Sequence, residues 1–325
     1  MTKNINLFIE YALFFLCLLF SCIIAFFGNF SSSVKEGIEL WVACVIPSLF
    51  PYFFITAILS SLSITSKISY CLSPFTKKVF KVNGTVSYAL FISLISGYPL
   101  GAKMVSDLKL KGLLNSTEAV RASVICSSSS PMFLIGSVGS IMFNDKRFGI
   151  TLFLCHILAV FVNGFIFSFY KKSEKPSSQN LSLPNKQVDN LLYESVYSSV
   201  ISILIVGGLI TIFYTLTRVL YQLNLFNSLI NALNLITKDQ NLSQGLIFGI
   251  FECTQGLKEL SKSGVGFLSL PLTLFICGFG GLSVIAQSIA FLKSAKIKTA
   301  PFLFSKVTSA VIGFLIGVIF SIFSL

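Results

Sequence analysis

The run SGYPLGAK at residues 96–103 decides the fold, because glycine and proline there interrupt an otherwise continuous apolar segment. Apolar residues 86–95 precede the run, and residues 104–114 follow it with charges that share one helical face. Proline is favoured in the first turn of a helix, so a second half-helix is expected to start at Pro99. The pattern predicts two half-helices separated by a break.

Composition places these half-helices in a membrane. Of the 325 residues, 54% are hydrophobic and 11% are charged, whereas an ordinary soluble domain is about 25% charged. Roughly 20 apolar residues span the hydrocarbon core of a bilayer as a helix. Runs of that length occupy residues 7–27, 41–62, 148–170, 196–217 and 301–325. The last contains only Lys306 as a charge, near its start. We therefore predict an all-α polytopic membrane protein, with the first run retained because no small-residue cleavage site follows it.

The charged and metal-binding residue types exclude several functions. The net charge is +12, but the basic residues lie in short connections, which is typical of contact with lipid headgroups and not of nucleic-acid binding. The eight cysteines form no CxxC pair, and His156 is the single histidine. We expect no disulfide framework, metal site, cofactor or catalytic residue, and an enzyme is the weakest hypothesis.

Further interruptions divide the chain. Pro47 and Pro51 would bend the second apolar run, and the serine run 127–130 ends at Pro131. Later breaks are expected around residues 252–259 and 280–287. Residues 171–195 form the most polar segment. We predict an N-terminal membrane half (1–170), a polar linker (171–195) and a C-terminal membrane half (196–325), with an amphipathic stretch at 221–241.

The two halves contain a weak internal repeat. A shift of 184 residues superimposes Gly97 on Gly281 and gives seven identities over residues 90–109. Glycine- or proline-interrupted segments at matching places in two halves indicate a transporter's binding site. The basic clusters at 67–81 and 171–186 could lie on one side of the membrane if residues 86–103 are re-entrant.

A helix that starts inside a membrane leaves unpaired N–H groups and the positive end of a dipole, which suit an anion or a polar substrate. Two alternatives stay open: Lys103 could be an interfacial lysine, and Glu252 could be a loop carboxylate paired with Lys258. The predicted substrate-binding residues are Ser96, Gly97, Tyr98, Pro99, Lys103, Ser128, Ser129, Ser130, Glu252, Thr254, Gln255, Gly280, Gly281, Ser283 and Gln287.

These runs, together with PSLFP at residues 47–51, resemble the YlbJ-type sporulation integral membrane proteins, over nearly the whole chain. The resemblance implies a nucleoside-recognition ("Gate") domain, similar to the core of nucleoside transporters, and a role in endospore formation and spore cortex development. It also implies a link with dipicolinate delivery, and a place in the cell membrane or outer forespore membrane. The family usually has an asparagine in the run SSNP, where this chain has Ser129, Ser130 and Pro131, and the lost amide puts a direct hydrogen-bonding role of Ser129 in doubt.

Three functions remain open. The first is a transporter or facilitator of a small organic anion, with dipicolinate as the leading candidate because a planar dianion suits opposed helix N-termini and Lys103. The second is a transporter of nucleosides or other neutral metabolites, and the third is a non-transporting scaffold for cortex assembly. The expected partners are the lipid bilayer and a small anion, with no nucleic acid. Self-association and association with other sporulation membrane proteins stay open.

Overall fold

The computed structural model describes residues 30–62, 64–171 and 190–324, together with Phe14, Leu18 and Ser21. Apart from those three residues, the predicted first span at 7–27 lies outside the described part, as do residues 172–189 of the predicted linker. Throughout the described ranges the regular elements are helices, without a strand. The all-α prediction is therefore confirmed.

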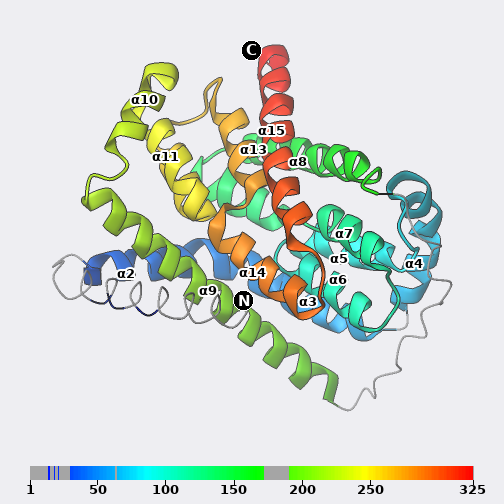
Figure 1. Cartoon of the computed structure of the whole chain (residues 1–325). Helices are drawn as coiled ribbons and strands as arrows, with labels where there is room; N and C mark the ends of the chain where they lie inside the picture. The colour runs from blue at the N-terminus through cyan, green and yellow to red at the C-terminus, as the bar shows by residue number, and fades with distance from the viewer. Residues whose placement is uncertain are drawn as a thin grey trace, which may run out of the picture.

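The helices follow one another closely along the chain (Figure 1). In the first half they are α2 (Phe30–Leu40), η1 (Trp41–Val45), α3 (Ile46–Ser61), α4 (Ile64–Phe75), η2 (Thr76–Phe80), α5 (Val86–Ser96), α6 (Leu100–Leu110), α7 (Ser116–Ile125), η3 (Met132–Met142) and α8 (Lys146–Phe167). In the second half they are α9 (Leu191–Gln222), α10 (Asn227–Thr237), α11 (Gln240–Phe251), α12 (Cys253–Ser261), α13 (Ser269–Phe279), α14 (Gly281–Ser294) and α15 (Thr299–Ser324). Here η marks a π-helical stretch.

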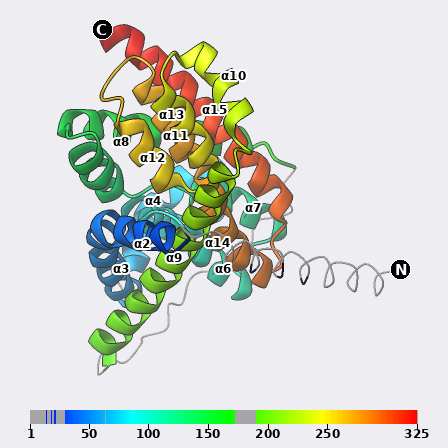
Figure 2. The same ribbon diagram turned by 90° about the vertical axis from the view of Figure 1, so that its left-hand side faces the viewer.

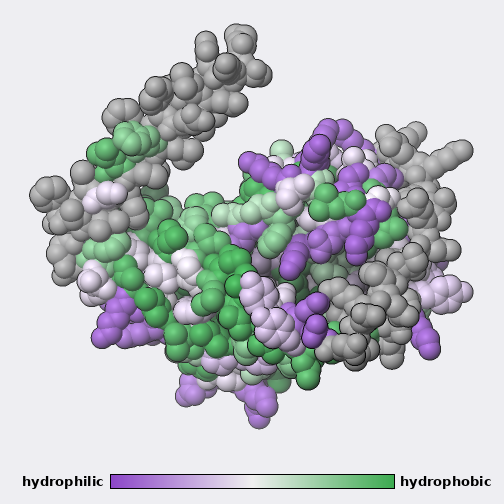
Figure 3. All heavy atoms as spheres, turned by 90° about the horizontal axis from the view of Figure 1, so that it is seen from below, coloured by the Kyte–Doolittle hydropathy of each residue, from purple (hydrophilic) through white to green (hydrophobic). Residues whose placement is uncertain are grey.

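Five stretches of the described chain are long and apolar enough to cross a bilayer: Phe30–Leu59, Lys146–Phe167, Leu191–Gln222, Ser269–Ser294 and Thr299–Phe323. Four of them start earlier than the sequence predicts, because α2 extends the second apolar run, α8 begins at Lys146, α9 includes residues 191–195 of the predicted linker, and α15 begins at Thr299. Apolar side chains cover a wide part of the face in Figure 3, and hydrophilic residues gather in separate groups toward its edges.

Short polar residues fix where several helices begin. The side chain of Asp145 accepts hydrogen bonds from the backbone N–H groups of Arg147 and Phe148 at the start of α8. Asp239 does the same at the start of α11, with Asn241 and Leu242. Each carboxylate satisfies N–H groups that have no partner inside the helix, and its charge is favourable at the positive helix end.

Serine hydroxyls bond to backbone carbonyls within the proline-containing span. In η1 and α3 the hydroxyl of Ser48 donates to the carbonyls of Cys44 and Val45, at 2.8 Å and 3.1 Å. Ser137, from η3, also donates to the Cys44 carbonyl at 2.6 Å. These hydroxyls give side-chain partners to the carbonyls of Cys44 and Val45, just before Pro47.

Small residues let the C-terminal helices approach closely. A Cβ on Gly278 of α13 would lie 2.7 Å from the carbonyl oxygen of Ser309, and one on Gly317 of α15 would lie 2.6 Å from the Cα of Pro271. Close backbone approach through glycine is a usual way for membrane helices to pack. The long helix α9 packs against α2 and α3 and runs obliquely across them in both ribbon views (Figures 1 and 2).

The interrupted helices take two forms. Helix α6 folds back on α5, and α12 folds back on α11, so that the two helices of each pair are in contact. This is the geometry expected of re-entrant segments. By contrast, α13 and α14 continue as one interrupted span. The order of a hairpin, an interrupted helix and a long helix occurs as α5–α6, α7–η3, α8 and again as α11–α12, α13–α14, α15. In this order the break between α5 and α6 would correspond to the break between α11 and α12. The 184-residue shift instead pairs Gly97 with Gly281, at the break before α14. The internal repeat itself stays a prediction.

Candidate functional site

The two breaks of the first half lie against each other. Gly97 separates α5 from α6 with φ 77° and ψ −170°. The N–H of Tyr98 donates to the carbonyl of Ser128 at 2.8 Å, and the hydroxyl of Ser128 donates to the carbonyl of Ser93 at 3.0 Å. A Cβ on Gly97 would lie 2.6 Å from the nitrogen of Ser130, so only glycine fits. The predicted breaks at 97–99 and 127–130 are confirmed.

The two breaks of the second half also meet. Glu252 is extended between α11 and α12, and its carboxylate accepts a hydrogen bond from the N–H of Gln255 at 2.6 Å. Gly281 begins α14, and a Cβ there would lie 2.8 Å from the nitrogen of Cys253. The carboxylate of Glu252 therefore caps α12. The alternative of a loop carboxylate paired with Lys258 does not hold, because no such ion pair forms within the described chain.

Tyr98 joins the two pairs of breaks. Its hydroxyl accepts a hydrogen bond from Ser129 at 2.7 Å and lies 3.8 Å from the sulfur of Cys253. A cavity of about 40 Å³ lies at this junction, enough for one or a few waters but not for a metabolite. Its lining includes the predicted residues Tyr98, Ser129, Ser130, Glu252, Thr254 and Gln287, together with Val45, Leu49, Phe133, Val206, Ile210, Cys253 and Val284.

A wider cavity of about 640 Å³ lies between α3, α6, α9 and α14. Its lining is mostly apolar and includes Pro99, Lys103 and Gln287 from the predicted set. Gln287 and Val206 line both cavities, so the small cavity and the wide one adjoin. A volume of 300 to about 1,000 Å³ is usual for small-molecule sites.

Other predicted residues lie close to the cavities without lining them. Gly97, Ser128 and Gly281 hold the breaks together, as described above. Ser96, Gln255 and Ser283 are buried, and within the described chain their side-chain polar atoms have no hydrogen-bond partner. The amide of Gln287, 4% exposed, is likewise without a partner. A buried polar group is normally hydrogen-bonded, so these four side chains depart from the usual pattern.

The prediction missed two buried basic residues at the same junction. His156 of α8 accepts a hydrogen bond at Nε2 from the N–H of Ser129, at 3.0 Å. Lys306 of α15 is 2% exposed, with its Nζ 5.1 Å from the ring centroid of Tyr98. Both were visible in the sequence as lone ionisable residues within apolar runs, which in a membrane are functional candidates by default. In the described ranges, no three of the side chains of His, Cys, Asp and Glu group as a metal site would require.

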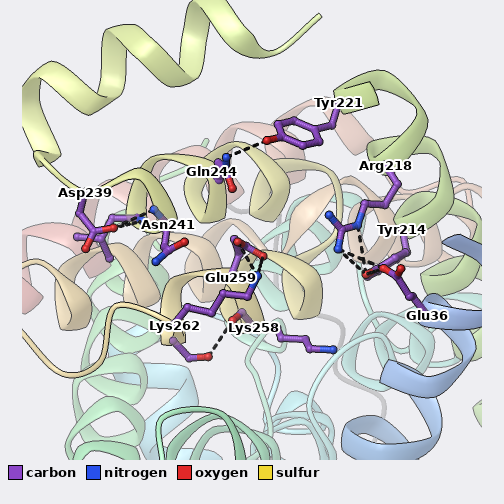
Figure 4. A network of polar contacts seen from close by, with 12 residues as sticks. Glu36, Tyr214, Arg218, Tyr221, Asp239, Asn241, Gln244, Lys258, Glu259 and Lys262 are labelled. Atoms are coloured by element: carbon purple, nitrogen blue, oxygen red, sulfur yellow. Dashed lines mark hydrogen bonds and ion pairs between the residues drawn. The ribbon is translucent and has the colours of Figure 1, made fainter. Parts of the chain in front are cut away.

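A second group of polar side chains lies away from the breaks (Figure 4). Arg218 of α9 pairs with Glu36 of α2 at 3.1 Å, and the hydroxyl of Tyr214 donates to the same carboxylate at 2.7 Å. Lys262 pairs with Glu259 at 2.7 Å near the end of α12. The first pair links α9 with α2, the second lies at the end of α12, and none of these residues lines the small cavity.

Comparison with characterised proteins agrees with this architecture. The sporulation integral membrane protein YlbJ of Bacillus subtilis (strain 168) is 30% identical over 308 residues, which covers 87% of this chain and 75% of that protein. This chain belongs to the YlbJ family of sporulation integral membrane proteins. A family model described as Gate, nucleoside recognition, matches residues 42–168. No solved structure matches the chain.

Membership of the YlbJ family confirms the resemblance and the membrane localisation seen in the sequence. The Gate match spans the first pair of breaks and includes Tyr98, Ser129 and His156. Glu252, Gln287 and Lys306 lie outside it, so the junction combines residues within the match with residues beyond it.

Proposed function

We propose that this protein moves a small organic anion across the membrane by alternating access around the four helix breaks, with dipicolinate as the first candidate substrate. The observation that carries the proposal is the junction itself, where four interrupted helical segments meet around a small cavity lined in part by the partnerless amide of Gln287. In a bilayer such breaks are tolerated where they are buried in protein or line a cavity.

The partnerless groups favour transport over a purely structural role. An unsatisfied buried polar group costs roughly 1–3 kcal/mol, and Ser96, Gln255, Ser283 and Gln287 are all in this condition. A scaffold could replace them with apolar residues and become more stable. A transporter needs such a group where it lines the cavity, as Gln287 does, because that group binds a substrate that is released again on the other side.

The sizes of the two cavities support a mechanism in which the site opens. The cavity at the junction, about 40 Å³, is too small for any metabolite, whereas the adjoining cavity, about 640 Å³, is large enough. We infer that the substrate enters the wide cavity past Lys103 and reaches Gln287, which lines both. Movement of the breaks would then enlarge the small cavity around it.

An anion is favoured by the local electrostatics. Lys103 lines the wide cavity, and α6 and α14 begin at the breaks with no side-chain cap on their positive ends. Glu252 is already engaged with the N-terminal turn of α12. The Gate description of the matching family favours a nucleoside as the second candidate, and the same experiment can separate the two.

Uptake into proteoliposomes tests the proposal. The purified protein should take up labelled dipicolinate, with excess unlabelled dipicolinate competing and uridine or adenosine not competing. Lys103→Ala should lower anion uptake while the protein stays in the membrane, and Lys111→Ala, an exposed lysine that follows α6, is the matched control. Competition by nucleosides alone would favour the second candidate, and no uptake of either class would favour a scaffold.

A further inference from the structure

Lys306 occupies an unusual position for a charged residue. It belongs to the membrane-spanning helix α15, and its side chain is almost fully buried. Its Nζ lies 5.1 Å from the centroid of the Tyr98 ring and 5.6 Å from that of Phe302. Two aromatic faces therefore surround the ammonium group, and such faces attract cations.

No acidic partner accompanies this lysine. Through the described part of the chain, carboxylates within 4.0 Å of a basic group belong to the pairs Lys35–Glu39, Arg218–Glu36 and Lys262–Glu259. Lys306 takes part in none of them. Aromatic faces stabilise an ammonium group only partly, whereas a buried charge is normally paired with an opposite charge. An opposite charge for Lys306 is therefore missing among the described residues.

The surroundings of Lys306 connect it with the cavity. Tyr98, which covers the ammonium group, also lines the small cavity. On another side the ammonium group approaches the break before α14, where a Cβ on Gly280 would lie 3.7 Å from Nζ. Ser283 and Gln287, on α14 just beyond that break, have partnerless polar atoms. A shift of the Tyr98 ring would open the ammonium group to the same space as the Gln287 amide.

We infer that Lys306 is the fixed cation that binds a carboxylate group of the transported molecule, with the Gln287 amide as a neighbouring donor. In the empty protein the Tyr98 and Phe302 rings hold the ammonium group, and the substrate carboxylate replaces the contact with Tyr98. This inference rests on the proposed function and assigns the charge recognition to α15, a helix outside the Gate match.

The chemistry fits a carboxylate better than a phosphate. Phosphate groups are recognised by several cations or by the planar fork of arginine. The arginines of the described chain lie elsewhere: Arg121 donates to the carbonyls of Lys81 and Tyr170, Arg218 pairs with Glu36, and Arg147 is exposed at the start of α8. A single ammonium group beside neutral amide and hydroxyl donors matches one carboxylate.

The test compares charge variants in proteoliposomes. Lys306→Met keeps the length and apolar stem of the side chain without the charge, and it should lower dipicolinate uptake by at least tenfold, mainly by raising KM. Lys306→Arg should retain part of the uptake because it retains the charge. Lys298→Met, at an exposed position just before α15, is the matched control and should leave uptake unchanged. If Lys306→Met takes up dipicolinate with an unchanged KM, the inference about Lys306 is overturned, whereas the proposed function is not.

A measurement on the unaltered protein covers the case in which Lys306→Met does not fold. In detergent, dipicolinate should raise the unfolding temperature, and the neutral pyridine-2,6-dicarboxamide of the same shape should not. Equal stabilisation by both compounds would overturn a carboxylate site. If the unaltered protein neither transports nor binds any carboxylate, the proposed function fails first and the assignment of Lys306 fails with it.

Discussion

Two groups of polar side chains in this protein differ in whether other described residues satisfy them. At the periphery, the partly exposed Arg218 and Glu36 and the buried Tyr214 satisfy one another (Figure 4). At the junction of the breaks, Lys306 is buried, with aromatic rings around it and no carboxylate from the described chain beside it. The contrast teaches that the first group holds helices together, whereas the second is left incomplete and suits a molecule from outside.

The largest effect is expected from closing the space between the breaks. Gly97→Ala would place a Cβ 2.6 Å from the nitrogen of Ser130, in a backbone conformation that only glycine adopts readily. The conformation should cost about 1–3 kcal/mol and the collision about the same again. We expect Gly97→Ala to unfold at a much lower temperature than the unaltered protein. Size-exclusion chromatography should show that most of its folded, monodisperse fraction is lost.

Gly208→Ala is the control for this change. A Cβ on Gly208 of α9 meets no atom within 4 Å, so the variant should unfold at the temperature of the unaltered protein. If Gly97→Ala is equally stable, the contact between the 97–99 break and the serine run does not organise the junction.

A smaller effect, on uptake and not on stability, is expected at Gln287. Gln287→Leu removes an amide that has no partner in the described chain, so stability should be unchanged or higher. Loss of one substrate hydrogen bond at a buried site should lower uptake by roughly tenfold or more. The measurement is initial uptake rate alongside the unfolding temperature of the same preparation.

Gln244→Leu gives the opposite expectation and sharpens the comparison. The Gln244 amide donates to the hydroxyl of Tyr221 at 3.0 Å, in the polar network of Figure 4 that lies away from the breaks. Loss of this hydrogen bond should lower stability and leave uptake intact. Equal behaviour of the two glutamine variants would remove the distinction between the junction and the periphery.

The smallest effect is expected for the peripheral ion pair. A double-mutant cycle with Arg218→Ala and Glu36→Gln should give a coupling of about 0.2–1 kcal/mol, weaker at high salt, because both side chains are partly exposed. Uptake should not change. A loss of uptake comparable to that of Lys306→Met would mean that this pair takes part in opening the site.

The sequence was sufficient for the class of fold and for the breaks. Glycine and proline at 97–99, the serine run before Pro131, and Gly280–Gly281 interrupt helices where the pattern predicts, because these residues act locally on the backbone. The helix α4 was not foreseen in the basic stretch 63–83, since lysines there suggested only a connection. The grouping of Tyr98, Ser129, Glu252 and Gln287 around one cavity was expected from the idea of paired breaks.

Which residues complete the site could not be derived in the same way. Lys306 was seen only as a charge near the start of the last apolar run, and its depth depends on how α15 packs against α13 and α8. His156 reaches Ser129 through a contact between residues 27 positions apart. Such long-range contacts depend on tertiary packing, which leaves no periodic signal in the sequence. Only the rule that ionisable residues inside membranes are functional candidates could have selected the two.

The length of α9 ties this protein to the thickness of its bilayer. A helix of 32 residues extends about 48 Å, well beyond the roughly 30 Å of the hydrocarbon core. It must therefore lean within the bilayer or project from it, and Figures 1 and 2 draw it running obliquely over α2 and α3. Because α9 forms one wall of the wide cavity, lipids with longer or shorter chains would alter that lean and, with it, the width of the cavity.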